Sequence, residues 1–255
     1  MAIRLVISGT CGRMGARIAT LALADGAFVI GGAIEAKGHQ AVGQDLGTVL
    51  GRAAIGVRVT DDPAAALRGG DVLIEFTTPV VTVEHVRLAR HAKTPAVIGT
   101  TGLSSEQRAV IADAAREVPI VLSPNMSVGV NLLFELVQAA ARRLGLGYDV
   151  EVIEAHHRAK QDAPSGTAKR LAELVAATRQ QSPQQIPVHA IRAGDIVGDH
   201  LVVFAGPSER LELVHRAHSR DAFAVGALRA AQFVARAQPG GLYDMSHVLQ
   251  AAPPR

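Results

Sequence analysis

The first half of the chain alternates short apolar segments with helical patterns, and this alternation limits its fold more than any other feature. Apolar runs typical of buried strands lie at 3–8, 28–35, 57–59, 72–75, 96–98 and 120–122. A helix follows the first run and ends near residues 25–26, and helical patterns at 80–93 and 104–117 separate the later runs. Repeated strand–helix–strand order predicts a parallel sheet with right-handed crossovers. Residues 36–55 carry four glycines, and we expect a mobile loop there rather than a helix.

The second half has a different order of elements. A long helix is predicted over 128–144, a strand over 150–155 and another helix over 167–178. Three strand-like runs follow at 188–193, 200–205 and 210–217, then an alanine-rich helix at 222–237. This order predicts an α+β domain with helices on one face of its sheet. The end of the chain at Pro253-Pro254 is expected to be frayed.

Composition excludes several classes of protein. The chain has 255 residues, of which 48% are hydrophobic, so a large core can form. It contains no run of 18 apolar residues, so we expect no membrane-spanning helix. Aromatic residues make up 3% and the formal charge is only +3, so we expect no nucleic-acid partner. One cysteine and no basic leader segment predict a cytoplasmic protein without an internal disulfide.

A glycine-rich turn joins the first strand to the first helix. Gly9, Gly12 and Gly15 stand where glycines allow a tight turn, close approach to a pyrophosphate and packing of helix against strand. Glu35 ends the second strand, where a carboxylate can bind the ribose hydroxyls of a dinucleotide. Together these features predict a Rossmann-type, dinucleotide-binding α/β domain.

Other residues near this turn, and the loops after later strands, allow two interpretations. Arg13 can reach a phosphate or can be a solvated helix residue, and Cys11 can be a small turn residue or a reactive thiol. The loops at 75–79, 99–102 and 123–129 follow strand ends, and ligands of parallel sheets lie beyond the carboxyl ends of strands. Their hydroxyl residues can contact ribose and nicotinamide, or can serve as turn and capping residues.

The segment 151–168 carries most of the predicted chemistry. A strand ends at His156, and His157 and Lys160 follow at once. The break at 164–166 opens a helix, whose first N–H groups can hold an anion. A histidine titrates near neutrality and suits general acid catalysis. Zinc is not expected, because neighbours on a strand point to opposite faces and no second ligand cluster is recognisable. A small substrate with carboxylates fits this segment best.

The pattern Glu-x-His-His-x-x-Lys-x-Asp-x-Pro-Ser-Gly-Thr-Ala at 154–168 resembles the signature of the dihydrodipicolinate reductases. These enzymes, also called 4-hydroxy-tetrahydrodipicolinate reductases, belong to the diaminopimelate and lysine pathway. The segments 9–15, 75–78, 99–102, 125–131, 192–198 and 241–245 share the resemblance. It implies a dinucleotide-binding domain of residues 1–126 with 220–255. It also implies a substrate-binding and tetramerisation domain of residues 127–219.

The resemblance also implies roles for individual residues. His156 is expected to be the general acid and Lys160 the catalytic lysine. The substrate contacts are expected to be His157, Ser165, Gly166 and Thr167. The nucleotide contacts are expected to be Gly9, Thr10, Cys11, Gly12, Arg13, Met14, Glu35, Gly99, Thr100, Thr101, Ser123, Pro124, Asn125 and Met126.

The expected enzyme is a homotetramer that contains no metal. It uses NADH, NADPH or both to reduce a small dicarboxylate. Some members of the family place Arg directly after the ribose-binding acid, whereas Ala36 and then Lys37 stand here, so the preferred cofactor stays open. Two rival functions are a two-domain dehydrogenase of an amino acid or amino-acid aldehyde, and a nucleotide sensor without catalysis. The grouping of His156, His157 and Lys160 disfavours both.

Overall fold

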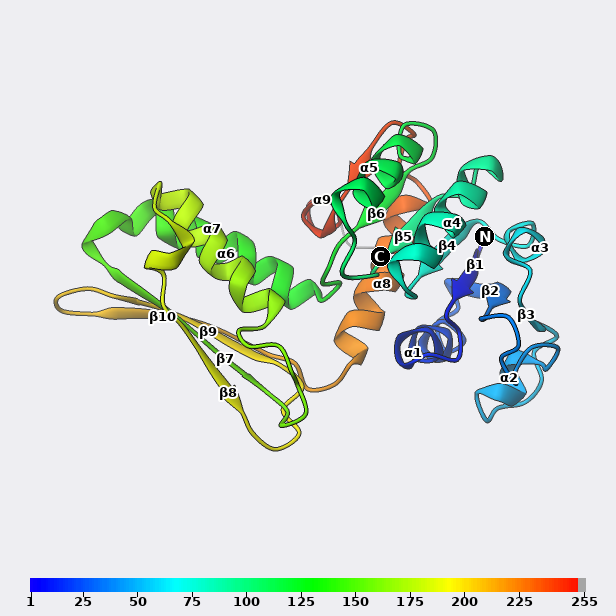
Figure 1. Ribbon diagram of the computed structural model, residues 1–255, viewed down its shortest axis with the longest axis horizontal. Helices are drawn as coiled ribbons and strands as arrows, with labels where there is room; N and C mark the ends of the chain where they lie inside the picture. Colours follow the sequence, from blue (N-terminus) through cyan, green and yellow to red (C-terminus); the bar gives the residue numbers. More distant parts are fainter. Residues whose placement is uncertain (252–255) are drawn as a thin grey trace. The chain divides into compact units, whose positions relative to one another are not determined.

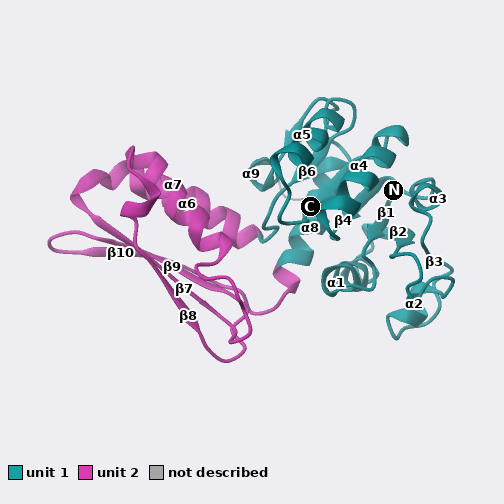
Figure 2. Cartoon of the chain, viewed as in Figure 1, with its two compact units in different colours: residues 1–127, 223–255 teal, residues 128–222 magenta. Residues whose placement is uncertain are grey.

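The computed structural model describes residues 1–251, and these residues form two compact units (Figures 1 and 2). Unit 1 comprises Met1–Ser127 and the chain from Phe223 onward, and unit 2 comprises Val128–Ala222. These boundaries lie within a few residues of the predicted ones. The predicted frayed end at Pro253-Pro254 lies outside the described residues.

Unit 1 is built on a seven-stranded parallel sheet in the order β11-β6-β5-β4-β1-β2-β3. The run 3-2-1-4-5-6 within it is the Rossmann strand order, so the predicted fold class is confirmed. The strands are β1 (Ile3–Ser8), β2 (Phe28–Ile34), β3 (Val59–Thr60), β4 (Val72–Glu75), β5 (Ala96–Ile98), β6 (Ile120–Leu122) and β11 (Leu242–Tyr243). The helices are α1 (Arg13–Ala22), α2 (Leu46–Val49), α3 (Pro63–Leu67), α4 (Pro79–His91), α5 (Ser105–Ala114), α8 (Asp221–Val234) and α9 (Met245–Gln250).

The central strands of unit 1 follow directly from the apolar runs. All four residues of β4 and all three of β5 are buried. Parallel strands covered on both faces read as continuous apolar segments, which explains why the predicted bounds of β1, β4, β5 and β6 are correct.

The prediction is wrong where short elements depend on capping or on distant pairing. The expected loop at 36–55 contains α2, because the Asp45 carboxylate accepts hydrogen bonds from the N–H groups of Gly47 and Thr48. The third strand is displaced to Val59–Thr60, and α3, α9 and β11 were not predicted. Strand β11 has two residues and exists only through its pairing with β6.

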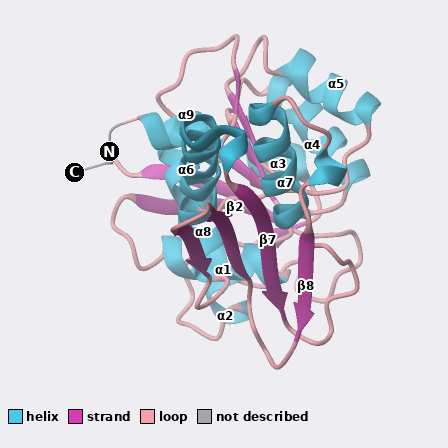
Figure 3. Ribbon diagram, turned by 90° about the vertical axis from the view of Figure 1, so that its left-hand side faces the viewer, coloured by secondary structure: helices cyan, strands magenta, loops and turns pink. Residues whose placement is uncertain are grey.

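Unit 2 is a four-stranded mixed sheet in the order β10-β9-β7-β8, with β7 and β8 parallel (Figure 3). Helices α6 and α7 cover one face, as predicted, through a core that includes Leu133, Leu171, Val202 and Phe204. The strands are β7 (Asp149–His156), β8 (Val188–Arg192), β9 (Asp199–Ala205) and β10 (Arg210–Arg216). The helices are α6 (Val128–Leu144) and α7 (Gly166–Arg179), with short 3₁₀ turns η1 (Gly145–Gly147) and η2 (Pro183–Gln185).

Close packing at the glycine turn predicts a large effect of one methyl group. A Cβ at Gly15 would lie 2.1 Å from the carbonyl oxygen of Gly9, whereas a Cβ at Gly26 would meet nothing within 4 Å. We expect Gly15→Ala to lower the free energy of unfolding by about 1–3 kcal/mol, as overpacking does. Gly26→Ala is the matched control and should unfold like the wild type. Urea denaturation measures both, and wild-type stability of Gly15→Ala would contradict this packing.

Candidate functional site

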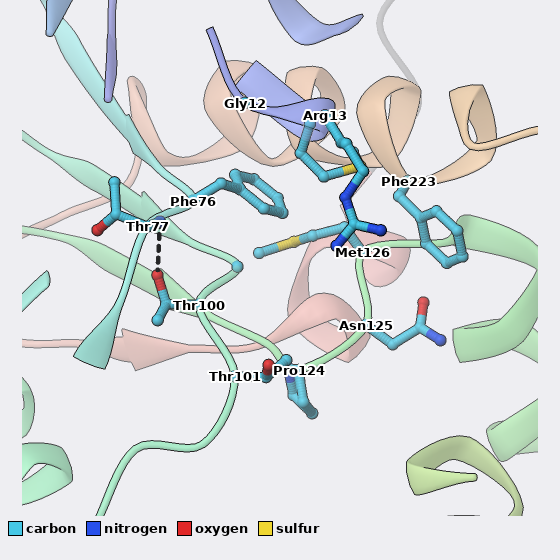
Figure 4. Close-up of a pocket in the computed structure, with 12 residues that line it drawn as sticks. Gly12, Arg13, Phe76, Thr77, Thr100, Thr101, Pro124, Asn125, Met126 and Phe223 are labelled. Carbon is cyan, nitrogen blue, oxygen red and sulfur yellow. Dashed lines mark hydrogen bonds between the residues drawn. The ribbon is translucent and has the colours of Figure 1, made fainter. Parts of the chain in front are cut away.

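A cavity of about 410 Å³ lies in unit 1 beside the carboxyl ends of the parallel strands (Figure 4). This edge of a Rossmann sheet is where such folds bind their ligands. The cavity is lined by Gly12, Arg13, Met14, Phe76, Thr77, Gly99, Thr100, Thr101, Pro124, Asn125, Met126 and Phe223. It therefore brings together predicted contacts from the glycine turn and from the loops after β5 and β6.

The amino end of α1 faces this cavity. Its N-cap residue is Gly12, which has no side chain to accept a hydrogen bond from the first turn, and Arg13 and Met14 of that turn line the cavity. A helix N-terminus with available N–H groups and a nearby guanidinium favours phosphate groups. The donors at this end of the cavity therefore fit the pyrophosphate of a dinucleotide.

Five predicted nucleotide contacts do not line the cavity: Gly9, Thr10, Cys11, Glu35 and Ser123. Thr10 is fully buried, and its hydroxyl donates to the carbonyl oxygens of Ile7 at 2.8 Å and Ile34 at 3.1 Å. Its N–H also donates to Ile34. The fold therefore already uses the hydroxyl and the N–H of Thr10, and its contact with a nucleotide stays a prediction.

Glu35 fixes the shape of the glycine turn. One carboxylate oxygen accepts the N–H of Cys11 and the other accepts the N–H of Ala36, each at 2.9 Å. Ser123 has a similar local role, because its hydroxyl donates to the carbonyl oxygen of Asn125 at 2.7 Å. Each carboxylate oxygen of Glu35 can still accept a second hydrogen bond.

Three cavity residues were missing from the predicted contacts: Phe76, Thr77 and Phe223. The first two belong to the loop at 75–79, which the sequence had placed on the ligand side of the sheet. The ring of Phe76 packs against Gly99 so closely that a Cβ there would lie 2.2 Å from it. Nothing in the sequence distinguishes Phe223 from the other apolar residues of its helix, so its place in the cavity could not be predicted.

A buried polar network lies at the same strand ends. Glu75, fully buried at the end of β4, accepts a hydrogen bond from the hydroxyl of Thr77, and its other oxygen lies 2.7 Å from Nδ1 of His85. The hydroxyl of Thr82 donates to that of Thr100 at 2.8 Å, and the Thr100 hydroxyl accepts the N–H of Thr77 at 3.2 Å (Figure 4). The network thus ties together two loops that line the cavity.

Unit 2 carries a second polar cluster, at the end of β7. Residues of β7 alternate between more exposed and buried positions, so Glu154 and His156 share the inward face with the buried apolar residues before them, Val150 and Val152. Arg192 on β8 donates to both carboxylate oxygens of Glu154, at 2.8 and 2.7 Å. Nδ1 of His156 lies 2.5 Å from the same carboxylate.

Burial and charge oppose each other in this cluster. Burial disfavours the charge on Glu154, but hydrogen bonds from Arg192, His156 and the Ser165 N–H outweigh it and lower the pKa of Glu154 to about 2. Burial lowers the pKa of His156, and Glu154 counteracts this effect. The charge of Lys160 also lowers the pKa of His156, so the two predicted catalytic residues lie near each other.

The remaining predicted substrate residues divide into exposed and buried ones. Nζ of Lys160 pairs with Asp162 at 2.8 Å, and His157 is partly exposed. Gly166 begins α7 and is exposed, and a Cβ there would meet nothing within 4 Å. Ser165 is buried, its N–H donates to Glu154 at 3.1 Å and its hydroxyl caps α7. The N–H of Ser165 is therefore already used within the protein, and its contact with a substrate carboxylate stays a prediction.

Within residues 1–251, no three His, Cys, Asp or Glu side chains come together as a metal site would require. In the same part of the chain, no helix has the length and apolar character needed to cross a membrane.

A Rossmann sheet with a cavity at its strand ends, and a separate unit with a buried histidine and a lysine, define a two-unit dehydrogenase-type protein. The family models named dihydrodipicolinate reductase, N-terminus and C-terminus, match residues 3–126 and 129–249. The chain belongs to the dihydrodipicolinate reductase family, as the sequence pattern predicted.

Relatives and solved structures agree with this membership. The 4-hydroxy-tetrahydrodipicolinate reductase of Rubrobacter xylanophilus is 49% identical over 98% of this chain and 100% of its own. That of Anaeromyxobacter dehalogenans strain 2CP-1 is 47% identical over 96% of this chain and 97% of its own. A dipicolinate-bound dihydrodipicolinate reductase from Paenisporosarcina sp. TG-14 superposes with a TM-score of 0.81 at 25% identity, covering 96% and 98% of the two chains.

The site geometry predicts an unreactive thiol at Cys11. Burial, and then the nearby charge of Glu35, raise the pKa of Cys11 to about 11. Because the thiolate is the nucleophile, alkylation by iodoacetamide at pH 7.5 should be about 100-fold slower than for an ordinary exposed thiol. The chain has one cysteine, so any alkylation of cysteine that mass spectrometry detects is that of Cys11. Unfolding in urea should restore the ordinary rate, and fast alkylation of the folded protein would contradict the environment described.

Proposed function

We propose that the protein reduces 4-hydroxy-tetrahydrodipicolinate to tetrahydrodipicolinate with a hydride from NADH or NADPH, in diaminopimelate and lysine biosynthesis. One observation carries this proposal: the His156–Lys160 signature stands in a chain that matches reductases of that name over nearly its whole length. The cavity at the end of the Rossmann sheet supports it, because a nicotinamide dinucleotide needs such a site.

The cofactor would be held by residues of unit 1 and would supply the hydride. The amino end of α1 and Arg13 suit its phosphates, while the loops at 99–101 and 124–126 suit its nicotinamide end. Glu35 can accept a ribose hydroxyl beside the bonds it already accepts. Lys37 is exposed and offsets repulsion between Glu35 and a 2′-phosphate, so we propose that both NADH and NADPH are used.

The residues of unit 2 would bind the substrate and supply a proton. The N–H groups at Gly166 and Thr167, at the start of α7, suit a carboxylate, and His157 would add a contact. Lys160 would orient the substrate and stabilise negative charge that develops on it, and His156 would donate the proton. The dipicolinate bound by the Paenisporosarcina reductase is a small dicarboxylate, which supports this class of substrate.

The assembly and location of the enzyme are part of the same proposal. Ile191 on β8 and Val214 on β10 are exposed by 45–47%, and by the alternation of side chains they lie on the sheet face that α6 and α7 do not cover, which suits a surface covered by other copies of the chain. We propose a homotetramer formed through unit 2 and a cytoplasmic location.

A turnover assay tests the reaction. Freshly generated substrate should cause a loss of the 340 nm absorbance of NADH and of NADPH. A nucleotide sensor would bind both cofactors, seen as a change in their fluorescence, without oxidising them. A dehydrogenase of amino acids or their aldehydes would act on those compounds and leave this substrate unchanged.

Lys160 should affect chemistry more than cofactor binding. We expect Lys160→Ala to lower kcat by a factor of about 100 or more, as loss of a positioned charge or proton donor does. The dissociation constant of NADH should stay near the wild-type value, because the cavity residues belong to unit 1. Arg143→Ala removes an exposed cation from the end of α6 and is the control. A wild-type kcat for Lys160→Ala in steady-state assays would refute its role.

Gly166 should affect substrate binding alone. A Cβ at this exposed start of α7 would meet no protein atom within 4 Å but would occupy the space that a carboxylate would use. We expect Gly166→Val to raise the substrate KM by roughly tenfold or more, and to weaken binding of dipicolinate as well. Gly147→Val, also in unit 2 and also without neighbours within 4 Å, is the control. Unchanged dipicolinate affinity, measured by calorimetry, would place the carboxylate site elsewhere.

A further inference from the structure

Glu154 is a buried acidic residue of unit 2 that has no role in the reaction proposed above. It is fully buried, and Arg192 and Ser165 donate hydrogen bonds to it. Arg192 contributes two N–H groups, Ser165 contributes its backbone N–H, and Nδ1 of His156 lies at 2.5 Å. A buried carboxylate with this many donors is ionised, because hydrogen bonds to the charged form favour it.

An ionised carboxylate determines which nitrogen of His156 carries a hydrogen. A carboxylate accepts hydrogen bonds and donates none, so Nδ1 of His156 must be protonated in both charge states of the ring. The proton that the ring gains and loses is therefore the one on Nε2. This nitrogen faces Gly198, where a Cβ would lie 3.1 Å from it, so the glycine leaves room beside the atom that titrates.

The charges that face His156 come from several elements. Glu154 lies on its own strand, Lys160 follows that strand, and Arg192 lies on β8. Lys160 and Arg192 disfavour the imidazolium, whereas Glu154 favours it. Asp162 pairs with Lys160 at 2.8 Å.

His200 lies edge-on to His156, with ring centroids 5.4 Å apart, and His215 on β10 lies beyond it. Burial, and then the charges of His156 and His215, lower the pKa of His200 to about 3. It is therefore neutral at physiological pH, and Glu154 is the anion in direct contact with His156.

We propose that Glu154 is a positioning residue that holds Nδ1–H of His156, so that Nε2 is the proton-donating atom, and that Arg192 limits how strongly this carboxylate favours the imidazolium. The catalytic use of that proton rests on the function proposed above, but the arrangement of the ring does not. A merely structural Glu154, which only joins β7, β8 and the start of α7, would affect stability without changing the titration of His156.

The test compares two variants that should shift the same titration in opposite directions. A general acid works in its protonated form, so the alkaline limb of the pH profile of kcat/KM follows the pKa of His156. Glu154→Gln removes the negative charge, so this limb should move to lower pH by about 1–3 units, the usual effect of one close charge. Arg192→Gln removes the competing positive charge and should move it to higher pH.

A matched control exists on the same strand. Glu151 pairs with His189 as Glu154 does with His156, but both partners are about half exposed. Glu151→Gln should therefore leave the pH profile unchanged. The affinity for NADH, which depends on unit 1, should be unchanged in all three variants.

Nitrogen-15 NMR of the histidine rings supplies a readout that needs no turnover. In the wild-type protein we expect neutral His156 to be protonated on Nδ1, and its ring pKa to fall in Glu154→Gln and rise in Arg192→Gln. If the enzyme fails to reduce the proposed substrate while these results are obtained, only the proposed function is refuted. Neutral His156 protonated on Nε2, or a ring pKa that the folded variants leave unchanged, would overturn the positioning role. Should Glu154→Gln not fold, the wild-type tautomer and Arg192→Gln still decide the question.

Discussion

Both units depend on a fully buried carboxylate at the end of a strand. Glu75 at the end of β4 and Glu154 near the end of β7 each contact a histidine, and each is linked to a serine or threonine of a neighbouring loop. A buried carboxyl group without such partners would be unfavourable, so the loops take positions that supply them. The carboxylates thereby order the loops beside the cavity in unit 1 and the start of α7 in unit 2.

The sequence predicted what is determined locally. Strands such as β4 are buried on both faces and stand out as apolar runs, and α6 was predicted with its observed bounds. The signature at 154–168 identified the catalytic candidates His156 and Lys160, because these residues lie close together in one segment of the sequence. Contacts between distant segments were not predictable in this way. Arg192 binds Glu154, which lies 38 residues earlier in the sequence. Phe223 lines the cavity but belongs to a helix whose sequence has no distinguishing pattern.

In the glycine turn, some residues of the motif hold the turn in shape and others line the cavity. Thr10 and Glu35 use their polar groups to hold the turn, through Ile7, Ile34, Cys11 and Ala36. Gly12 and the first turn of α1 are what remains to face the cavity. A contact list inferred from a whole motif therefore includes residues that build the site as well as residues that line it.

The signature in unit 2 has the same division, and the geometry of its elements explains it. Alternation along β7 directs Glu154 and His156 inward, and the capping role of Ser165 draws its N–H and hydroxyl into the protein. Gly166 comes next, begins α7 and is exposed. In the proposed reaction the buried members thus hold and orient the ring of His156, while the exposed members leave space for the proposed binding of a substrate carboxylate.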